Sequence, residues 1–140
     1  MNDTGQLLSQ AACARLCTDF ANFVDSRNYD RFVDLFTDDA VFDRVGVISE
    51  GRQAIRAFLD ARPADLVTRH VCTNIAVDLV SETAATGVSY AIFFHASVEA
   101  NASPPFQSAA PGLAEYHDVY TRTAEGWRIR ERRVKLIFKA

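Results

Sequence analysis

The residues that decide the fold are LAEYHDVYTRT (113–123), AEG (124–126) and WRIRERRVKLIF (127–138). The first and third segments alternate between polar and apolar residues and are rich in Val, Ile, Phe and Tyr, which is typical of half-buried β-strands. The three residues between them predict a hairpin connection. The last part of the chain is therefore expected to form two antiparallel strands.

The same period of two extends upstream of this hairpin. Residues 68–80 and 83–98 predict two more long strands, and Ser81-Glu82 predicts the turn between them. Residues 101–111 contain three prolines and two serines, so we expect a mobile loop over one end of the sheet.

The first half of the chain has a helical period instead. Apolar residues recur at helical spacing over residues 7–23, and the turn-prone residues 25–28 end this helix. Shorter helices are expected at 29–35 and 52–61, with two short strands at 40–45 and 46–50. Helices followed by an antiparallel meander indicate an α+β fold, with the helices on one face of a curved sheet. We expect one domain, residues 1–140, that can enclose a pocket.

Composition argues against several classes of protein. The net charge is −3, and the arginines of residues 128–133 alternate with apolar residues as in a strand with a solvated face, so we expect no nucleic-acid partner. Cys13, Cys17 and Cys72 lack the spacing of a disulfide framework or a zinc knuckle. No leader or long apolar run is present, which favours a cytoplasmic protein with no membrane partner. No Gly-rich phosphate loop or paired-histidine spacing occurs, so we expect neither cofactor nor metal.

His70 is the best candidate for acid/base chemistry, because histidine titrates near neutral pH and a carboxylate commonly orients it. Strand alternation predicts that His70, Cys72 and Asn74 share one face, opposite a second set of strand residues. Asp25 follows an apolar helix face, where a carboxylate needs a partner. The pattern alone favours the simpler reading that Asp25 ends the first helix and caps the next one. The β-strand residues expected on the face opposite His70 are Val71, Ile75, Val77 and Leu79.

Other polar residues are candidates for binding a substrate oxygen. His95 and His117 lie in strands, and either could face the cavity or serve as a structural hydrogen-bonding residue. Tyr90 and Tyr116 could donate phenolic hydrogen bonds, or they could simply pack with an exposed hydroxyl.

The order of several short motifs along nearly the whole chain resembles the SnoaL-like branch of the nuclear transport factor 2-like superfamily. The motifs, in chain order, are VDSRNYDRF (24–32), LFTDDA (35–40), GRQAI (51–55), TRHVCTN (68–74) and GWRI (126–129). The resemblance implies a cone-shaped α+β barrel in which three N-terminal helices pack on a strongly curved, mixed and mostly antiparallel sheet around an apolar cavity.

The nearest motifs are those of the scytalone dehydratase and hexachlorocyclohexane dehydrochlorinase branch. Members of that branch carry an aspartate after the first helix and a histidine early in the first long strand, and Asp25 and His70 fall on these positions. The resemblance implies that the histidine removes a proton while the aspartate holds it. It also suggests Arg132 for the position of a later arginine and His95 for that of a second histidine. Together with Tyr90 and Tyr116, these are the residues expected to bind substrate oxygens.

This chain also departs from the family pattern. Phe20 stands where the dehydrochlorinase has a lysine, and Val24 and Arg44 stand approximately where the dehydratase has tyrosines. We therefore expect a cofactor-independent lyase, a dehydratase of a hydrophobic cyclic or aromatic hydroxy compound. An isomerase, a polyketide-type cyclase, a non-catalytic binding module and an oxygenase-associated subunit are the alternatives. Apolar residues on both faces of the long strands further predict a homodimer or homotrimer.

Overall fold

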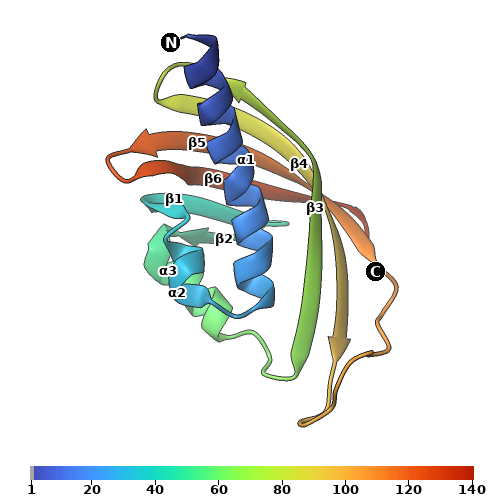
Figure 1. Cartoon of the computed structure of the whole chain (residues 1–140). Helices are drawn as coiled ribbons and strands as arrows, with labels where there is room; N and C mark the ends of the chain where they lie inside the picture. Colours follow the sequence, from blue (N-terminus) through green and yellow to red (C-terminus); the bar gives the residue numbers. More distant parts are fainter. Residues whose placement is uncertain (1) are drawn as a thin grey trace.

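The structure is a computed structural model that describes residues 2–140; residue 1 of the predicted domain lies outside the described residues. Figure 1 shows a single curved sheet with helices on one side. The elements in chain order are α1 (Asp3–Asp25), α2 (Tyr29–Val33), β1 (Phe36–Arg44), β2 (Val47–Glu50), α3 (Gly51–Asp60), β3 (Leu66–Leu79), β4 (Ala84–Ser97), β5 (Gly112–Thr123) and β6 (Gly126–Phe138).

The six strands form one sheet in the order β2-β1-β6-β5-β4-β3. β1 runs parallel to β6, and every other neighbouring pair is antiparallel. The predicted mixed, mostly antiparallel sheet and the α+β class are thus confirmed. The sheet is strongly bent, but β2 and β3 remain unpaired edges, so the cone is open rather than a closed barrel.

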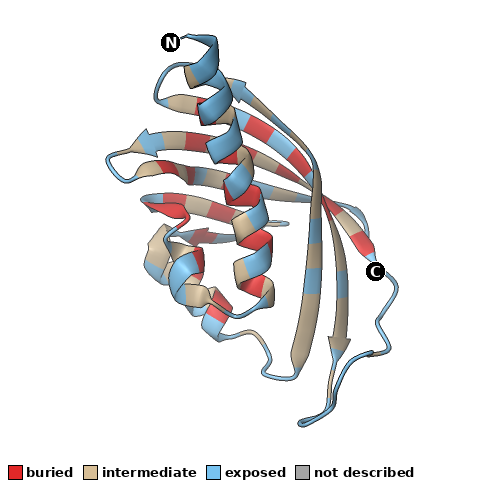
Figure 2. Cartoon of the chain, viewed as in Figure 1, coloured by how far each residue is buried: buried red, intermediate tan, exposed pale blue. Residues whose placement is uncertain are grey.

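Helix α1 lies across the concave face of the sheet, and α2 and α3 lie beside its C-terminal end (Figure 1). The side chain of Asn2 caps α1 by accepting a hydrogen bond from the Gly5 amide at 2.8 Å. Figure 2 shows that the buried residues of α1 follow the side that faces the sheet. Leu16, Phe20 and Val24 on this side are buried, each stabilising the fold by about 1.5–3 kcal/mol.

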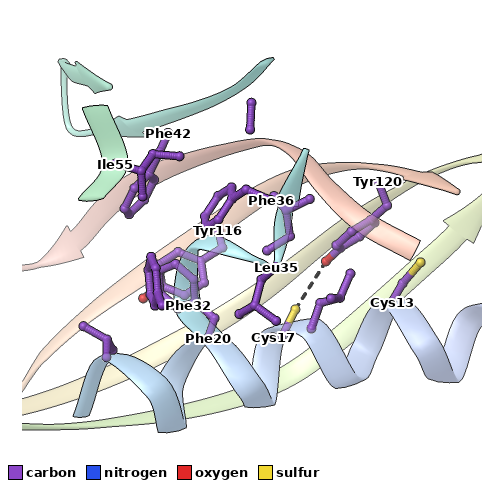
Figure 3. Packing of buried hydrophobic residues seen from close by; sticks show 14 of the residues in the cluster. Cys13, Cys17, Phe20, Phe32, Leu35, Phe36, Phe42, Ile55, Tyr116 and Tyr120 are labelled. Carbon is purple, nitrogen blue, oxygen red and sulfur yellow. Dashed lines mark hydrogen bonds between the residues drawn. The ribbon is translucent and has the colours of Figure 1, made fainter. Parts of the chain in front are cut away.

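An aromatic cluster joins the helices to β1 and β5. The Phe20 ring lies 4.6 Å from Phe32, 5.7 Å from Phe42 and 5.6 Å from Tyr116, measured between centroids. Figure 3 shows these rings gathered between α1 and the strands. Most pairs are tilted or edge-to-face, which is the favourable arrangement for aromatic quadrupoles. This cluster forms one wall of the cavity described below.

One prediction about strand faces was wrong. The pairing of β3 with β4 shifts register between Thr73 and Ala76, and Asn74 has a left-handed φ of 53°. This bulge reverses the alternation. His70 and Cys72 face inward before it as predicted, but Asn74 is exposed. The residues packed against the core beyond the bulge are Ile75, Val77 and Leu79, which strict alternation had put on the opposite face.

Candidate active site

Asp25 and His70 contact each other through two hydrogen bonds. Asp25 is the last residue of α1, and His70 lies in the first half of β3. The Asp25 Oδ1 atom lies 2.6 Å from His70 Nδ1, and Oδ2 accepts the His70 backbone N–H at 2.7 Å. The alternative prediction, that Asp25 caps the next helix, was wrong, because the Asn28 side chain caps α2.

Two further residues hold the Asp25 carboxylate in place. Thr68 donates its hydroxyl hydrogen to Asp25 Oδ1 at 2.8 Å, and Arg62 donates to Thr68 Oγ1 at 3.1 Å. Arg62 also donates to the Val24 carbonyl and to the Tyr29 hydroxyl. Asp25 therefore receives three hydrogen bonds and is fixed from β3 and from the segment after α3, which leaves its carboxylate little freedom.

This arrangement determines the tautomer of His70. An ionised carboxylate can only accept hydrogen bonds, so Nδ1 carries the proton that faces Asp25. In the neutral ring, Nε2 then holds the free lone pair on the opposite side. Nε2 has no hydrogen-bond partner within residues 2–140. It is therefore available as a base toward a bound molecule.

His70 lines an apolar cavity of about 270 Å³ between the helices and the sheet. Its side chain is 19% exposed, and that of Asp25 is 9% exposed. The polar wall residues besides His70 are Arg44, Arg62, Thr68 and Tyr116. The apolar wall residues are Phe20, Val24, Phe32, Phe42, Val45, Phe58, Phe93, Ala114, Val134 and Leu136. An apolar cavity with a few converging polar groups has the usual character of a small-molecule site.

A close backbone contact positions Phe93 in the cavity wall. Gly112 is buried opposite Phe93 in the pairing of β4 with β5, and a Cβ atom at residue 112 would overlap the Phe93 ring. The Phe93 ring also lies 6.4 Å from the His70 ring. Glycine at residue 112 thus lets the tip of the Phe93 ring pack closely against the backbone of β5.

A larger hollow of about 700 Å³ lies at the other end of β1 but has a different character. Its wall includes Asp34, Asp38, Asp39 and Arg52 and contains no histidine. Its lining is mostly charged or polar, whereas the smaller cavity combines apolar walls with the Asp25–His70 pair. We therefore take the smaller cavity as the candidate active site.

The structure brings only some of the predicted substrate-binding residues to this cavity. Tyr116 lines it, and burial raises the pKa of its hydroxyl, so that this group stays protonated as a donor. His95 lies on the inner side of β4, its ring stacked 6.5 Å from Phe93, just beyond the cavity wall. Tyr90 points to the outer face and is 36% exposed, because its neighbours Ser89 and Ala91 take the inward positions. Tyr90 is therefore not part of the candidate site, contrary to the prediction.

Arg132 lies behind the cavity wall rather than in it. Its guanidinium is fully buried and is held between the rings of Phe20 and Tyr116, at 4.3 and 4.2 Å from their centroids. Nε and one terminal nitrogen both donate to Asp118 at 2.8 Å. Arg132 thus supports two rings of the cavity from behind, and its charge is neutralised by Asp118.

Cys17 lies beside the buried pair of Arg132 and Asp118 and forms part of the same buried polar group. Its sulfur lies 3.2 Å from Arg132 and 3.3 Å from the hydroxyl of Tyr120, the second contact being the dashed line in Figure 3. Hydrogen bonding by the Cys72 thiol and the charge of Arg132 lower the pKa of Cys17 to about 6, against the effect of burial. Burial, by contrast, is the main cause that raises the pKa of Cys13 to about 12.

Sequence reasoning missed several members of the site. Arg62 carries no motif signal, and Thr68 stands in the TRHVCTN motif without a role assigned to it, since the roles of both depend on the path of the chain after α3. The buried group could have been suspected from β5, where Tyr116, Asp118 and Tyr120 occupy alternate positions on one face. A carboxylate between two inward tyrosines requires a buried cation. The outer histidine, His117, instead contacts Glu115 at 3.0 Å and lies away from the cavity.

Fold and geometry together define an open α+β cone with a carboxylate–imidazole pair at the wall of an apolar cavity. The profile of the SnoaL-like domain matches residues 5–133, and the chain belongs to this family. No sequence among the curated proteins matches it.

Several solved structures are similar over nearly the whole chain. LinA, a hexachlorocyclohexane dehydrochlorinase, has a TM-score of 0.85 and 25% identity over 99% of this chain and 92% of its own. A protein provisionally named scytalone dehydratase, from Novosphingobium aromaticivorans DSM 12444, has a TM-score of 0.81 and 21% identity over 98% and 89%. A protein of unknown function from Mycobacterium tuberculosis has a TM-score of 0.80 and 23% identity over 94% and 73%. The shared fold therefore accompanies more than one function.

No group of three or more His, Cys, Asp or Glu side chains within residues 2–140 is arranged to hold a metal ion. No helix in the same range has the length and apolar character needed to cross a membrane.

Proposed function

We propose that this protein is a cofactor-independent lyase, a dehydratase that removes water from a hydrophobic cyclic or aromatic hydroxy compound. The observation that carries the proposal is the 2.6 Å contact between Asp25 Oδ1 and His70 Nδ1 at the wall of an apolar cavity. This contact leaves His70 Nε2 as a free base facing the space where a substrate would bind.

The chemistry needs one proton acceptor and one proton donor, and His70 can supply both. Nε2 removes a proton from a substrate carbon next to an activating group, and the C–H electron pair becomes part of a new double bond. The imidazolium then gives its proton to the departing hydroxyl group, which leaves as water. Asp25 stabilises the positive charge on the ring between these steps, and general acid–base catalysis of this kind contributes about 10²–10⁴-fold in rate.

Tyr116 is placed to bind a substrate oxygen. Its side chain lines the cavity, and its hydroxyl has no hydrogen-bond partner in the described part of the chain. Because burial raises the pKa of this hydroxyl, it remains a donor at neutral pH. A fixed donor that faces developing negative charge lowers the barrier to proton removal.

The names of two relatives support an elimination reaction. LinA is named a dehydrochlorinase, and a second similar structure is provisionally named a dehydratase. Loss of hydrogen chloride and loss of water are both eliminations in which a base can remove a proton from carbon. The dehydrochlorinase motif has a lysine where this chain has buried Phe20, which favours water over chloride as the leaving group.

The proposal is tested by incubating the full chain with a panel of cyclic and aromatic hydroxy compounds and measuring products by mass spectrometry. A dehydratase yields a product lighter by one water, whereas an isomerase yields a product of unchanged mass. We expect His70→Gln and Asp25→Asn to reduce turnover by about 10²–10⁴-fold.

His117→Gln is the matched control, because it removes an outer-face histidine and leaves the cavity intact. Turnover that survives both His70→Gln and Asp25→Asn undiminished would refute the mechanism. A ligand that binds tightly but is never converted would instead favour a binding module.

A further inference from the structure

Arg44 is a cavity-wall cation without a carboxylate partner. It ends β1, and its guanidinium lies 3.4 Å from the centroid of the Phe58 ring. Its Nε atom is buried and has no hydrogen-bond partner. Within residues 2–140 the Arg44 side chain forms neither a hydrogen bond nor an ion pair, and only the rings of Phe42 and Phe58 contact its charge.

The other two arginines at or behind the cavity wall have protein partners for their charged groups. Arg62 donates to Val24, Tyr29 and Thr68. Arg132, behind the wall, is neutralised by Asp118, although its Nη1 atom is buried without a hydrogen-bond partner. Within residues 2–140, Arg44 is thus the cavity-lining arginine whose charge has neither a carboxylate nor a hydrogen-bond partner.

The chain holds Arg44 in this position by a tight turn. Val45 and Gly46 between β1 and β2 both have left-handed φ values, 54° and 89°, which is typical of the turns that close two-residue hairpins. The nearest carboxylate in the sequence, Asp43, accepts the Gly46 amide at 2.7 Å and so serves the turn. The turn therefore places Arg44 at the cavity while engaging the acidic side chain that could have neutralised it.

An unpaired guanidinium in an apolar wall has an energetic cost. Burial lowers the pKa of Arg44 from its ordinary value, although an arginine remains charged in proteins. A group that is partly desolvated and lacks its counter-ion binds an incoming anion more strongly than a solvated one does. Guanidinium geometry also matches a carboxylate, since two parallel N–H groups can contact its two oxygens.

Arg44 and His70 approach the cavity from different sides. β1 and β3 are separated in the sheet by β6, β5 and β4, and the bend of the sheet turns both residues toward the same space. An apolar cavity of about 150 Å³ is large enough for benzene, so the 270 Å³ here accommodates a substituted ring. One molecule of this size can extend from Arg44 to His70.

We infer that Arg44 is a specificity-determining residue that binds a carboxylate of the substrate, so that the protein acts on ring-containing hydroxy acids. The inference rests on the proposed function for the reaction at His70, whereas the binding of the carboxylate can be measured without turnover. In the bound substrate, Arg44 holds the acid group and the rings of the cavity wall hold the hydrocarbon. The reacting C–H group is then directed to His70 Nε2.

The test compares the binding of 2-naphthoate with that of its neutral analogue of similar shape, 2-naphthamide, by isothermal titration calorimetry at neutral pH. A charge-assisted hydrogen bond contributes about 1.5–3 kcal/mol, so the full chain should bind naphthoate roughly 10–100-fold more tightly. Arg44→Met keeps an apolar contact with Phe58 but removes the charge, and should reduce this preference to less than about 2-fold. Arg44→Lys should retain part of the preference.

Arg130→Gln is the matched control, because it removes an exposed arginine of β6 and the same unit of charge. It should leave the preference for naphthoate unchanged. Binding of naphthamide by Arg44→Met, together with an unchanged circular dichroism spectrum, shows that the variant is folded. Equal binding of both compounds by the unmodified chain, or a preference that persists in Arg44→Met, would overturn the inference.

Turnover separates failure of this inference from failure of the proposed function. If His70-dependent dehydration occurs but hydroxy acids and their amides have the same kcat/KM, Arg44 does not select the substrate and the inference is wrong. If Arg44→Met abolishes the preference for naphthoate while no hydroxy acid is dehydrated, the carboxylate site stands and the dehydratase proposal is wrong.

Discussion

Arg132 and Asp118 form a bidentate ion pair in which both side chains are completely buried, at 0% exposure each. Their two hydrogen bonds are 2.8 Å long, and the hydroxyl of Tyr120 donates a third one to Asp118 at 2.7 Å. The pair links β5 to β6 directly behind the rings of Phe20 and Tyr116. The shape of the cavity wall therefore depends on a charge pair that no solvent reaches.

Removing one partner of this pair should destabilise the fold strongly. We expect Asp118→Asn to lower the free energy of unfolding by about 3–5 kcal/mol, because Arg132 would remain buried with an uncompensated charge. Urea unfolding monitored by circular dichroism measures this change. The double variant Asp118→Leu with Arg132→Met should recover most of the loss.

An exposed ion pair provides the comparison for this prediction. Arg15 and Asp19 are four residues apart on α1, and the Arg15 side chain is 73% exposed. Asp19→Asn should change the free energy of unfolding by less than about 1 kcal/mol. A similar cost for Asp118→Asn and Asp19→Asn would contradict the role assigned to the buried pair.

Thr68 is expected to act on the reaction through Asp25. Thr68→Val keeps the shape of the side chain but removes the 2.8 Å hydrogen bond to the carboxylate. Loss of one such bond corresponds to about 1 kcal/mol, so kcat should fall several-fold while KM changes little. Steady-state kinetics with a converted substrate measures both constants, and Thr68→Ser, which restores the hydroxyl, should recover kcat. A rise in KM at unchanged kcat would show that Thr68 binds the substrate instead.

The pKa shifts of the buried thiols determine how the free energy of unfolding should depend on pH. The pKa of Cys17 is lowered to about 6 from 9.0, so the folded state favours its thiolate. The stabilisation is complete above the unfolded pKa of 9.0 and is lost as the pH falls through 6. The difference in free energy of unfolding between the unmodified chain and Cys17→Ser should therefore grow from pH 6 to pH 9. We expect growth of at least about 1.4 kcal/mol, the equivalent of one pKa unit.

Cys13 supplies the control for this pH dependence. Its pKa is raised to about 12, so its contribution is complete below 9.0 and is lost only as the pH rises toward 12. Across pH 6–9, Cys13→Ser should differ from the unmodified chain by a constant amount. A constant difference for Cys17→Ser as well would show that its thiol is not ionised in the folded protein.

Most of the fold could be predicted because periodicity reports which face of each element is buried. The helical period of residues 7–23 identified α1, and the period of two identified all four long strands. The start of β1 was less visible. The predicted strand covers residues 40–45, whereas β1 begins at Phe36 and its register with β6 shifts between Phe36 and Val41. An irregular strand of this kind has no local signature.

The candidate site was less accessible from pattern alone. Asp25 and His70 lie 45 positions apart, and without the family resemblance the pattern favours Asp25 as a helix cap. Arg44 was noted only as a departure from a relative. Its open guanidinium became evident once the turn at Val45 and the engagement of Asp43 were known. Long-range proximity and the absence of a partner are properties of the fold rather than of any segment.

The prediction of a homodimer or homotrimer remains to be tested. Val71, Val88 and Phe94 lie on the outer face of β3 and β4 and are 47%, 38% and 37% exposed. Covering such a face with a second copy would remove apolar surface from water. We expect light scattering to show a dimer or trimer at micromolar concentration, and Val88→Lys with Phe94→Lys to yield monomers. Ala12→Lys, at an exposed position of α1, is the control and should leave the assembly intact. A monomeric unmodified chain would contradict the prediction.

The bulge at Asn74 sets which side chains of β3 reach the core. A side chain with a Cβ branch in the left-handed conformation costs about 1–2 kcal/mol, whereas glycine adopts it freely. Asn74→Val should therefore lower the free energy of unfolding by about that amount, and Asn74→Gly should leave it unchanged or raise it slightly. Asn22, an exposed residue inside α1, is the control, because Asn22→Gly should destabilise the helix there. If Asn74→Val were as stable as the unmodified chain in urea unfolding, the left-handed bulge would not be what fixes Ile75, Val77 and Leu79 in the core.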